Sequence, residues 1–187
     1  MALQRFVIDG YGQVEINNCA FRRDGRIEAQ CTANTSNFAT AKVENGMILA
    51  VDNAKREVGF AAASNELPVA LVYSAEHIYD ERTPGLKNFA LNGDGSEEFL
   101  PRLGYLAVGD KYTTNCFCFD STEYSDNDAF LSALDALDTT PVYGTISTVG
   151  APVVSSTAPT KGLKMRVVRK TTMPDGQPAV MFQVYAD

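Results

Sequence analysis

Hydrophobic and polar residues alternate with a period of two along most of the chain, a pattern that is typical of β-strands. The clearest stretch covers residues 100–120 (LPRLGYLAVGDKYTTNCFCFD). Alternation on both sides of Gly109-Asp110 predicts two strands joined by a tight turn. Because apolar residues stand on both faces of the first strand, we expect both faces to be at least partly buried. This stretch is therefore the expected centre of the sheet.

Turn-forming residues divide the rest of the chain into further short strands. Asp9-Gly10-Tyr11-Gly12, Asp52-Asn53 and Pro174-Asp175-Gly176 each stand between apolar alternating runs, as the turns of β-hairpins do. The pattern weakens between residues 74 and 102, where a long excursion could carry partner contacts. The predicted elements are hairpins over residues 5–17, 46–60 and 163–185, and single strands over residues 67–73 and 142–149.

One segment departs from the strand period and predicts an amphipathic helix over residues 126–137. Ser125 is a good N-cap residue, and Asp128 three positions later completes a capping box. The apolar residues of this segment recur at helical spacing and share one face: Phe130, Leu131, Leu134 and Leu137. We expect this helix to pack across a sheet.

These elements predict a mainly β fold: an antiparallel sandwich or barrel-like sheet with one short amphipathic helix and a C-terminal hairpin. Residues 150–162 (GAPVVSSTAPTKG) are rich in Pro, Ser, Thr and Ala, a composition that is typical of linkers. The predicted organisation is a main β-rich domain over residues 1–149, a linker over residues 150–162, and a hairpin over residues 163–187 that can pack on the main domain.

Composition and charge narrow the class of protein. With 187 residues, 45% hydrophobic and 21% charged, the chain is long and apolar enough to bury its own core. Its net charge of -7 opposes nucleic-acid binding, which depends on Lys and Arg displacing counterions from phosphates. We therefore expect no nucleic-acid partner.

The ends and the apolar runs of the sequence bear on its location. No signal peptide opens the chain, and no run approaches the roughly 18 apolar residues of a membrane span. We expect a protein made in a cytoplasm and not bound to a membrane. In that reducing compartment the four cysteines are expected to be thiols.

Catalytic signatures are missing from the sequence. The single histidine, His77, has no serine or cysteine in a nucleophile motif to act on, so a surface role is the expectation. Cys116 and Cys118 fall on one side of a strand and, with Cys19 and Cys31, make four possible zinc ligands. The eleven residues between Cys19 and Cys31 do not fit the paired spacing of structural zinc. Buried thiols and no cofactor are expected.

Two acidic regions are possible cation sites. Residues 92–98 (NGDGSEE) bring oxygen ligands such as Asp94 close to glycines, but they lack the ligand order of an EF-hand and also fit a plain turn. Asp120, Glu123, Asp126 and Asp128 form a second cluster, which alternatively favours the helix N-terminus through its dipole. Whether an ion binds near Asp94 or Asp126 stays open at this point.

Three segments carry a resemblance to a known class of protein. They are GMILAVDNAKREVGF (residues 46–60), LPVALVYSAEHIYDERTPGLKNFAL (residues 67–91) and PRLGYLAVGDKYTTN (residues 101–115). Together they resemble the structural proteins of tailed-bacteriophage virions, and among these the head-decoration or cement proteins. The resemblance covers roughly residues 44–115 and does not extend to the predicted helix or the C-terminal hairpin.

The resemblance implies a non-enzymatic β-rich protein on the capsid surface of a virion, made in the host cytoplasm. Its implied partner is the major capsid protein, which it binds and stabilises, often by self-associating on the shell. The segment Ala2, Leu3, Gln4, Arg5 and Phe6 is the predicted partner contact, as an arm that adds a strand to a neighbour. An ordinary first strand is the alternative. Other functions left open are a tail, neck or head-fibre component and a cytosolic ligand-binding β domain.

Overall fold

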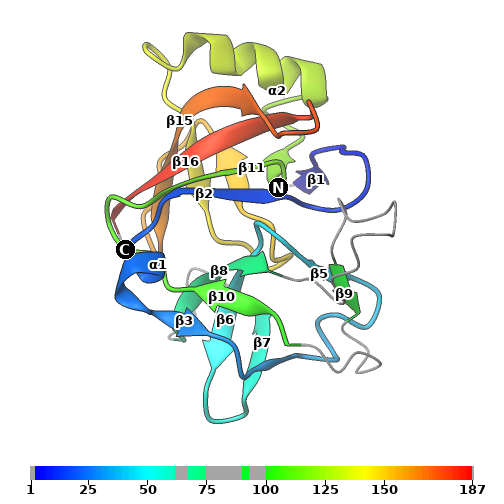
Figure 1. Ribbon diagram of the computed structural model, residues 1–187. Helices are drawn as coiled ribbons and strands as arrows, with labels where there is room; N and C mark the ends of the chain where they lie inside the picture. Colours follow the sequence, from blue (N-terminus) through cyan, green and yellow to red (C-terminus); the bar gives the residue numbers. More distant parts are fainter. Residues whose placement is uncertain (1–2, 62–66, 75–89, 93–99, 187) are drawn as a thin grey trace.

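A computed structural model describes residues 3–61, 67–74, 90–92 and 100–186. Strands make up 42% of the chain and helices 10%, which confirms the prediction of a mainly β fold with a C-terminal hairpin. Figure 1 shows a large sheet in the upper half of the molecule, with a helix across its top and a second sheet below. Both large sheets are mixed, because each contains one parallel pair among antiparallel ones.

The larger sheet has eight strands, and its order does not follow the sequence. Its pairs are antiparallel except for the parallel pair β12 and β14. In spatial order the strands are β1 (Leu3–Arg5), β12 (Cys118–Asp120), β14 (Val153–Ser155), β13 (Tyr143–Thr145), β15 (Lys164–Thr172), β16 (Pro178–Ala186), β11 (Lys111–Thr114) and β2 (Val14–Asn18).

This sheet has to curl, because three residues connect two strands that are far apart in its order. β11 is seventh and β12 second, so a flat sheet would separate them by five spacings, or about 24 Å. The four residue steps from Thr114 to Cys118 reach only about 14 Å. The edge strands β1 and β2 do not pair with each other in the described part of the chain. The sheet is therefore barrel-like but not closed.

The second sheet has six strands and a small two-stranded sheet beside it. β6 and β7 form the hairpin predicted over residues 46–60, and β8 pairs on the other side of β6. In order the strands are β3 (Ile27–Glu28), β10 (Arg102–Gly104), β8 (Val69–Ser74), β6 (Ile48–Asp52), β7 (Glu57–Phe60) and β4 (Thr32–Ala33), and the small sheet pairs β5 (Lys42–Glu44) with β9 (Ala90–Asn92).

Two hydrophobic cores hold these sheets together. The first centres on an aromatic cluster in which Phe6 stacks on Phe117 with ring centroids 4.5 Å apart, and Phe119 stacks on Phe130 at 5.6 Å. The second packs the six-stranded sheet against the other face of the first sheet, and includes Leu49, Val58, Leu103, Cys116 and Val153. β6 and β8 have apolar residues on both faces and contribute to both cores, whereas β10, the strand near residue 103, contributes only Leu103 to the second.

The predicted helix is present, with a different cap. α2 (Asn127–Ala133) continues as the short 3-10 helix η1 (Leu134–Ala136). The N-cap is Asp126 and not Ser125, because a carboxylate oxygen of Asp126 accepts the Ala129 N–H at 2.8 Å. A second helix, α1 (Ala20–Asp24), was not predicted; it ends at Gly25, whose φ of 69° is left-handed. No helix in the described ranges is long and apolar enough to cross a membrane.

Two predicted hairpins are wrong. The strands expected to pair within residues 5–17 are β1 and β2, which lie at opposite edges of the curled sheet. The strands on either side of Gly109 are β10 and β11, which belong to different sheets. In both places the alternation of apolar and polar residues correctly predicts strands. It does not indicate which other strand each of them pairs with.

All described strands from β11 to β16 belong to the large sheet. β15 and β16 form the hairpin predicted over residues 163–185, and they pair outward with β13 and β11. Residues 150–162, predicted to be a linker, contain β14, which pairs with both β12 and β13. The Ser and Thr content of this segment suggested a linker, but the paired Val153 and Val154 are buried.

Candidate interaction surface

The predicted contact segment, residues 2–6, begins as an ordinary strand of this chain's own sheet. Leu3–Arg5 forms β1 and pairs with β12. Phe6 is only 1% exposed and belongs to the aromatic core, whereas Leu3 is 37% exposed. Ala2 lies outside the described residues. The structure thus places Leu3, Gln4 and Arg5 at a sheet edge and Phe6 in the interior.

β1 is an edge strand that pairs with β12 on one side. The Phe6 N–H donates to the Phe117 carbonyl at 3.0 Å, which makes Phe6 and Phe117 a hydrogen-bonded pair. Such pairs alternate with non-bonded pairs along an antiparallel ladder, so the backbone groups of Leu3 and Arg5 point away from β12. No strand in the described part of the chain pairs with this edge.

An apolar groove lies beside Leu3. Its volume is about 470 Å³, within the range of about 300–1,000 Å³ that binding pockets occupy. Hydroxyl side chains of residues 145, 147, 148, 155, 157 and 160 surround the apolar part, and no lining residue is charged. The apolar lining residues are Leu3, Ile146, Val153, Ala158 and Pro159.

The sheet register explains why Leu3 and the groove share one face. Arg5 pairs with Cys118, Cys118 with Val153, and Val153 with Thr145. Directly paired residues point to the same side of a sheet. Leu3 is two positions before Arg5 and therefore lies on that side as well. The groove is thus the part of this face that the second core leaves uncovered.

A cluster of polar contacts links Arg5 of β1 to Glu44 of β5 and to Cys116. Arg5 Nη2 lies 2.9 Å from Glu44 Oε2, and Arg5 Nη1 lies 3.2 Å from Cys116 Sγ. The same Glu44 oxygen accepts the Gly12 N–H at 2.5 Å. Asn115, which is buried, accepts the Gln13 N–H at 2.7 Å. These contacts position the edge strand and the chain that leads to β2.

The cysteines do not form a reactive centre in this arrangement. All four are buried free thiols, as predicted. Burial raises the pKa of Cys19 and Cys116 to about 12 and that of Cys31 to about 11. Burial also raises the pKa of Cys118. Because the thiolate is the nucleophile and the metal ligand, these protonated thiols suit a packing role.

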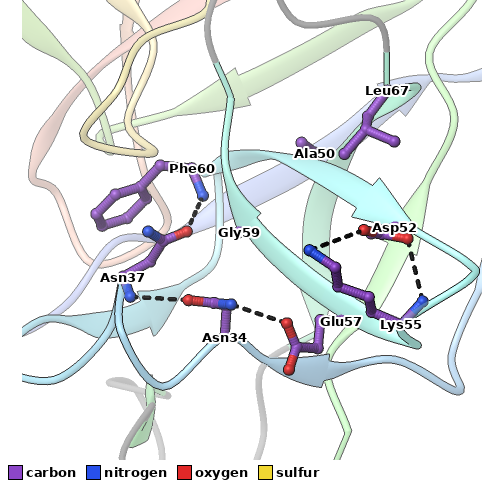
Figure 2. Close-up of a pocket in the computed structure, with 9 residues that line it drawn as sticks. All are labelled: Asn34, Asn37, Ala50, Asp52, Lys55, Glu57, Gly59, Phe60 and Leu67. Atoms are coloured by element: carbon purple, nitrogen blue, oxygen red, sulfur yellow. Dashed lines mark hydrogen bonds and ion pairs between the residues drawn. The ribbon is translucent and has the colours of Figure 1, made fainter.

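A second, polar pocket of about 130 Å³ lies against the β6–β7 hairpin. Figure 2 shows its polar side chains bound to one another: Asn37 Oδ1 accepts the Phe60 N–H at 2.8 Å, and Asn34 Nδ2 donates to Glu57 Oε2 at 2.8 Å. Asp52 accepts the Lys55 N–H at 3.1 Å. The pocket is smaller than ordinary ligand sites, and its network fastens the loop after β4 to β7.

The acidic cluster at α2 binds protein donors. Asp120 accepts the Thr122 N–H at 2.9 Å, Glu123 accepts the Ser155 hydroxyl at 2.7 Å, and Asp126 caps the helix. Within the described ranges, no three or more His, Cys, Asp or Glu side chains are arranged to hold a metal ion. His77 and Asp94 lie outside those ranges.

Of the groove residues, only Leu3 belongs to the predicted contact segment. The others come from the strand expected over residues 142–149 and from the segment taken as a linker, and they were not predicted as a site. Their small apolar and hydroxyl side chains carry no motif. The groove exists only because β1 pairs with β12 across more than a hundred residues and β12 pairs in turn with β14. Such a site has no local sequence signal.

Comparison of the chain with protein-family models, with curated proteins and with solved structures found no match. The groove beside Leu3 and the chemistry of the residues around it are therefore the features that bear on function.

Proposed function

We propose that this protein is a non-enzymatic structural component of a tailed-phage virion, where it binds the major capsid protein and stabilises the shell. The observation that carries the proposal is the uncharged apolar groove between Leu3 of β1 and the residues of β13 and β14. Exposed apolar concave surfaces are suited to binding other polypeptides.

The chemistry of the described residues supports binding in preference to catalysis. The thiols, which are the strongest nucleophiles of the chain, are buried with raised pKa values. The carboxylates Asp120, Glu123 and Asp126 are occupied by hydrogen bonds from the protein itself. The acidic net charge of -7 favours protein partners over nucleic acid. The virion setting comes from the resemblance of residues 44–115 to decoration proteins.

The test is to locate and count the protein in purified virus particles. Quantitative mass spectrometry is expected to find it at a copy number comparable with the capsid protein, and electron microscopy is expected to place it on the outer shell. Shells without the protein are expected to lose genome at lower temperature, and adding the purified chain is expected to restore them. A few copies per particle would point to a tail, neck or head-fibre component. Presence in infected-cell lysate but never in particles would overturn the proposal.

A further inference from the structure

We propose that the apolar groove beside Leu3 binds a fatty acid or a similar alkyl chain with one anionic end. The alkyl chain lies in the groove, and the anionic end faces Lys164 and Arg166 of the nearby strand β15. This inference goes beyond the proposed function and does not rest on it, because it concerns a small ligand of the isolated protein.

The lining of the groove suits an alkyl chain. Its volume of about 470 Å³ is that of a small-molecule site, and no lining residue is charged. Two of its hydroxyl groups are already bound to the protein, because Ser147 Oγ donates to the Ala151 carbonyl at 2.6 Å and Ser155 Oγ donates to Glu123 at 2.7 Å. The other hydroxyl residues are threonines, each of which also carries a methyl group. Aliphatic groups therefore make up most of the lining.

Two cations lie on the same face of the sheet, one strand beyond the groove. Thr145 of β13 lines the groove and pairs with Lys164 of β15, and directly paired residues point to the same side. Arg166 is two positions further along β15 and shares that side. Within the described part of the chain neither cation forms an ion pair, and Arg166 donates to the Gln183 amide oxygen at 3.2 Å. Both charges are therefore available to an anionic group.

The carboxylates near the groove set the direction of the ligand. Asp120 is the partner of Leu3 in the ladder of β1 and β12, and Glu123 binds the Ser155 hydroxyl at 2.7 Å. An anionic group at this end of the groove would face like charges, whereas at the β15 end it faces cations. The alkyl chain therefore extends from β15 toward Leu3.

The charge of the ligand's head group tests the site on the wild-type chain. The probes are dodecanoate, dodecyl maltoside and dodecyltrimethylammonium, which share one alkyl chain and carry a negative charge, no charge and a positive charge. Isothermal titration calorimetry below the micelle concentration of each probe measures the dissociation constants. The net charge of -7 attracts cations to the protein as a whole, so nonspecific binding would favour dodecyltrimethylammonium. We expect the opposite order, with dodecanoate binding most tightly.

The length of the alkyl chain tests burial in the groove. Octanoate, decanoate and dodecanoate carry the same head group. Each added CH₂ group is expected to tighten binding about fourfold, the effect of burying one CH₂. The dissociation constant is expected to stop falling with carboxylates whose chains are longer than the groove.

Substitutions of the two cations test the position of the anionic end. Lys164→Gln and Arg166→Gln each remove one positive charge, and each is expected to weaken dodecanoate binding about two- to fivefold, the range of a solvent-exposed ion pair. Binding of dodecyl maltoside is expected to stay unchanged. Lys55→Gln is the matched control, because Lys55 lines the polar pocket of the β6–β7 hairpin and not the groove. It is expected to bind all three probes like the wild type.

Substitutions in the groove test the position of the alkyl chain. Leu3→Asp and Ala158→Asp place a charge in the lining, and dodecyl maltoside is the probe because its uncharged head group is not repelled. Each variant is expected to bind it about tenfold more weakly or less, since the new charge loses its water when the chain binds. Val168→Asp is the matched control, since Val168 in β15 is 38% exposed and Leu3 is 37% exposed, but Val168 does not line the groove. It is expected to bind like the wild type.

The wild-type measurements decide the inference without any variant. Tightest binding of dodecanoate, with a preference that the Lys164→Gln/Arg166→Gln double variant loses, supports it. Absence of dodecanoate binding, tighter binding of the cationic probe, or affinity that does not depend on chain length overturns it. Equal losses in Leu3→Asp and Val168→Asp overturn the groove as the site, and an anion preference that survives in the double variant overturns the position of the anionic end. The proposed function is tested separately, by the copy number of the protein in virus particles.

Discussion

Arg5 and Glu44 form an ion pair, with Nη2 and Oε2 2.9 Å apart, that joins the edge strand β1 to β5 of the small sheet. Glu44 also accepts the Gly12 N–H, close to the start of β2. The Glu44 carboxylate thus contacts Arg5 in β1 and Gly12, which lies two residues before β2. It connects the two edge strands of the curled sheet, β1 and β2. Because β1 is only three residues long, this contact contributes directly to its position and to the geometry of the apolar groove beside Leu3.

Removing this carboxylate should loosen β1. Glu44→Ala leaves the Arg5 guanidinium without its acid and the Gly12 N–H without its acceptor, and it is expected to lower the free energy of unfolding by about 1–3 kcal/mol. Glu44→Gln keeps an acceptor oxygen and should cost less. Urea unfolding measures the stability, and hydrogen exchange of β1 measures the local opening.

A matched ion pair on the surface provides the control. Arg23 Nε lies 2.7 Å from Asp24 Oδ1, but both side chains are well exposed. Exposed pairs contribute little to stability, so Asp24→Ala should leave the unfolding curve almost unchanged. Equal effects of Glu44→Ala and Asp24→Ala would contradict the role assigned to Glu44.

Strand positions could be predicted from the sequence because they depend on local alternation. The hairpins β6–β7 and β15–β16 were predicted with their partners as well, since a short turn leaves each strand little choice. The hairpin predicted at Gly109 is wrong, although the φ of Gly109 is 97° and the sequence there is typical of a hairpin turn. There the chain passes from one sheet to the other, because β11 pairs with β16 and β2.

The apolar groove beside Leu3 could not be predicted for a related reason. Leu3, Val153 and Ala158 become neighbours only after β1 and β14 have both paired with β12. Parallel and long-range pairings carry no turn signal between their strands. The thiols were correctly expected to be buried, because that expectation depends on residue type and strand faces and not on which strands pair.

The buried thiols predict slow chemical labelling. Burial raises the pKa of Cys116 to about 12, so its thiol is protonated at pH 8, and the side chain is fully buried. All four cysteines are expected to react with a thiol reagent only as fast as the chain opens or unfolds. Labelling time courses with and without urea measure this. One cysteine that reacts rapidly in the native protein would instead favour an enzyme or redox function.

The helix cap predicts a loss of stability in acid. Hydrogen bonds from the Ala129 N–H and the Ser125 hydroxyl hold the pKa of Asp126 below its ordinary value of 3.8. A folded-state pKa below the unfolded one contributes stability above about pH 4, and this contribution is lost as the pH falls through the folded-state value. Asp126→Asn keeps a capping side chain but cannot titrate. It is expected to reduce the acid dependence of unfolding between about pH 2 and pH 5.

Ser125→Ala is the control for the cap itself. Ser125 was predicted as the N-cap, but its hydroxyl binds the Asp126 carboxylate and not a helix N–H. At neutral pH, Asp126→Ala is expected to destabilise the protein more than Ser125→Ala, since only the first removes the acceptor of the Ala129 N–H. The reverse order in thermal unfolding would show that the cap is Ser125 in solution.

Gly59 and Asn37 predict a non-additive pair of substitutions. A Cβ at position 59 would overlap Asn37 Oδ1, while its other neighbours lie at ordinary distances of 3.6 Å. Gly59→Ala therefore has to displace the side chain that accepts the Phe60 N–H (Figure 2). We expect Gly59→Ala and Asn37→Ala each to cost about 1–2 kcal/mol, the penalty for leaving the partly buried Phe60 N–H unpaired. In the Asn37→Ala background the obstacle is gone, so Gly59→Ala should cost little, because alanine suits a strand better than glycine.

A double-mutant cycle in urea measures the coupling. Additive costs would mean that position 59 is restricted by the backbone and not by Asn37, and that the polar network does not fasten the loop after β4 to β7.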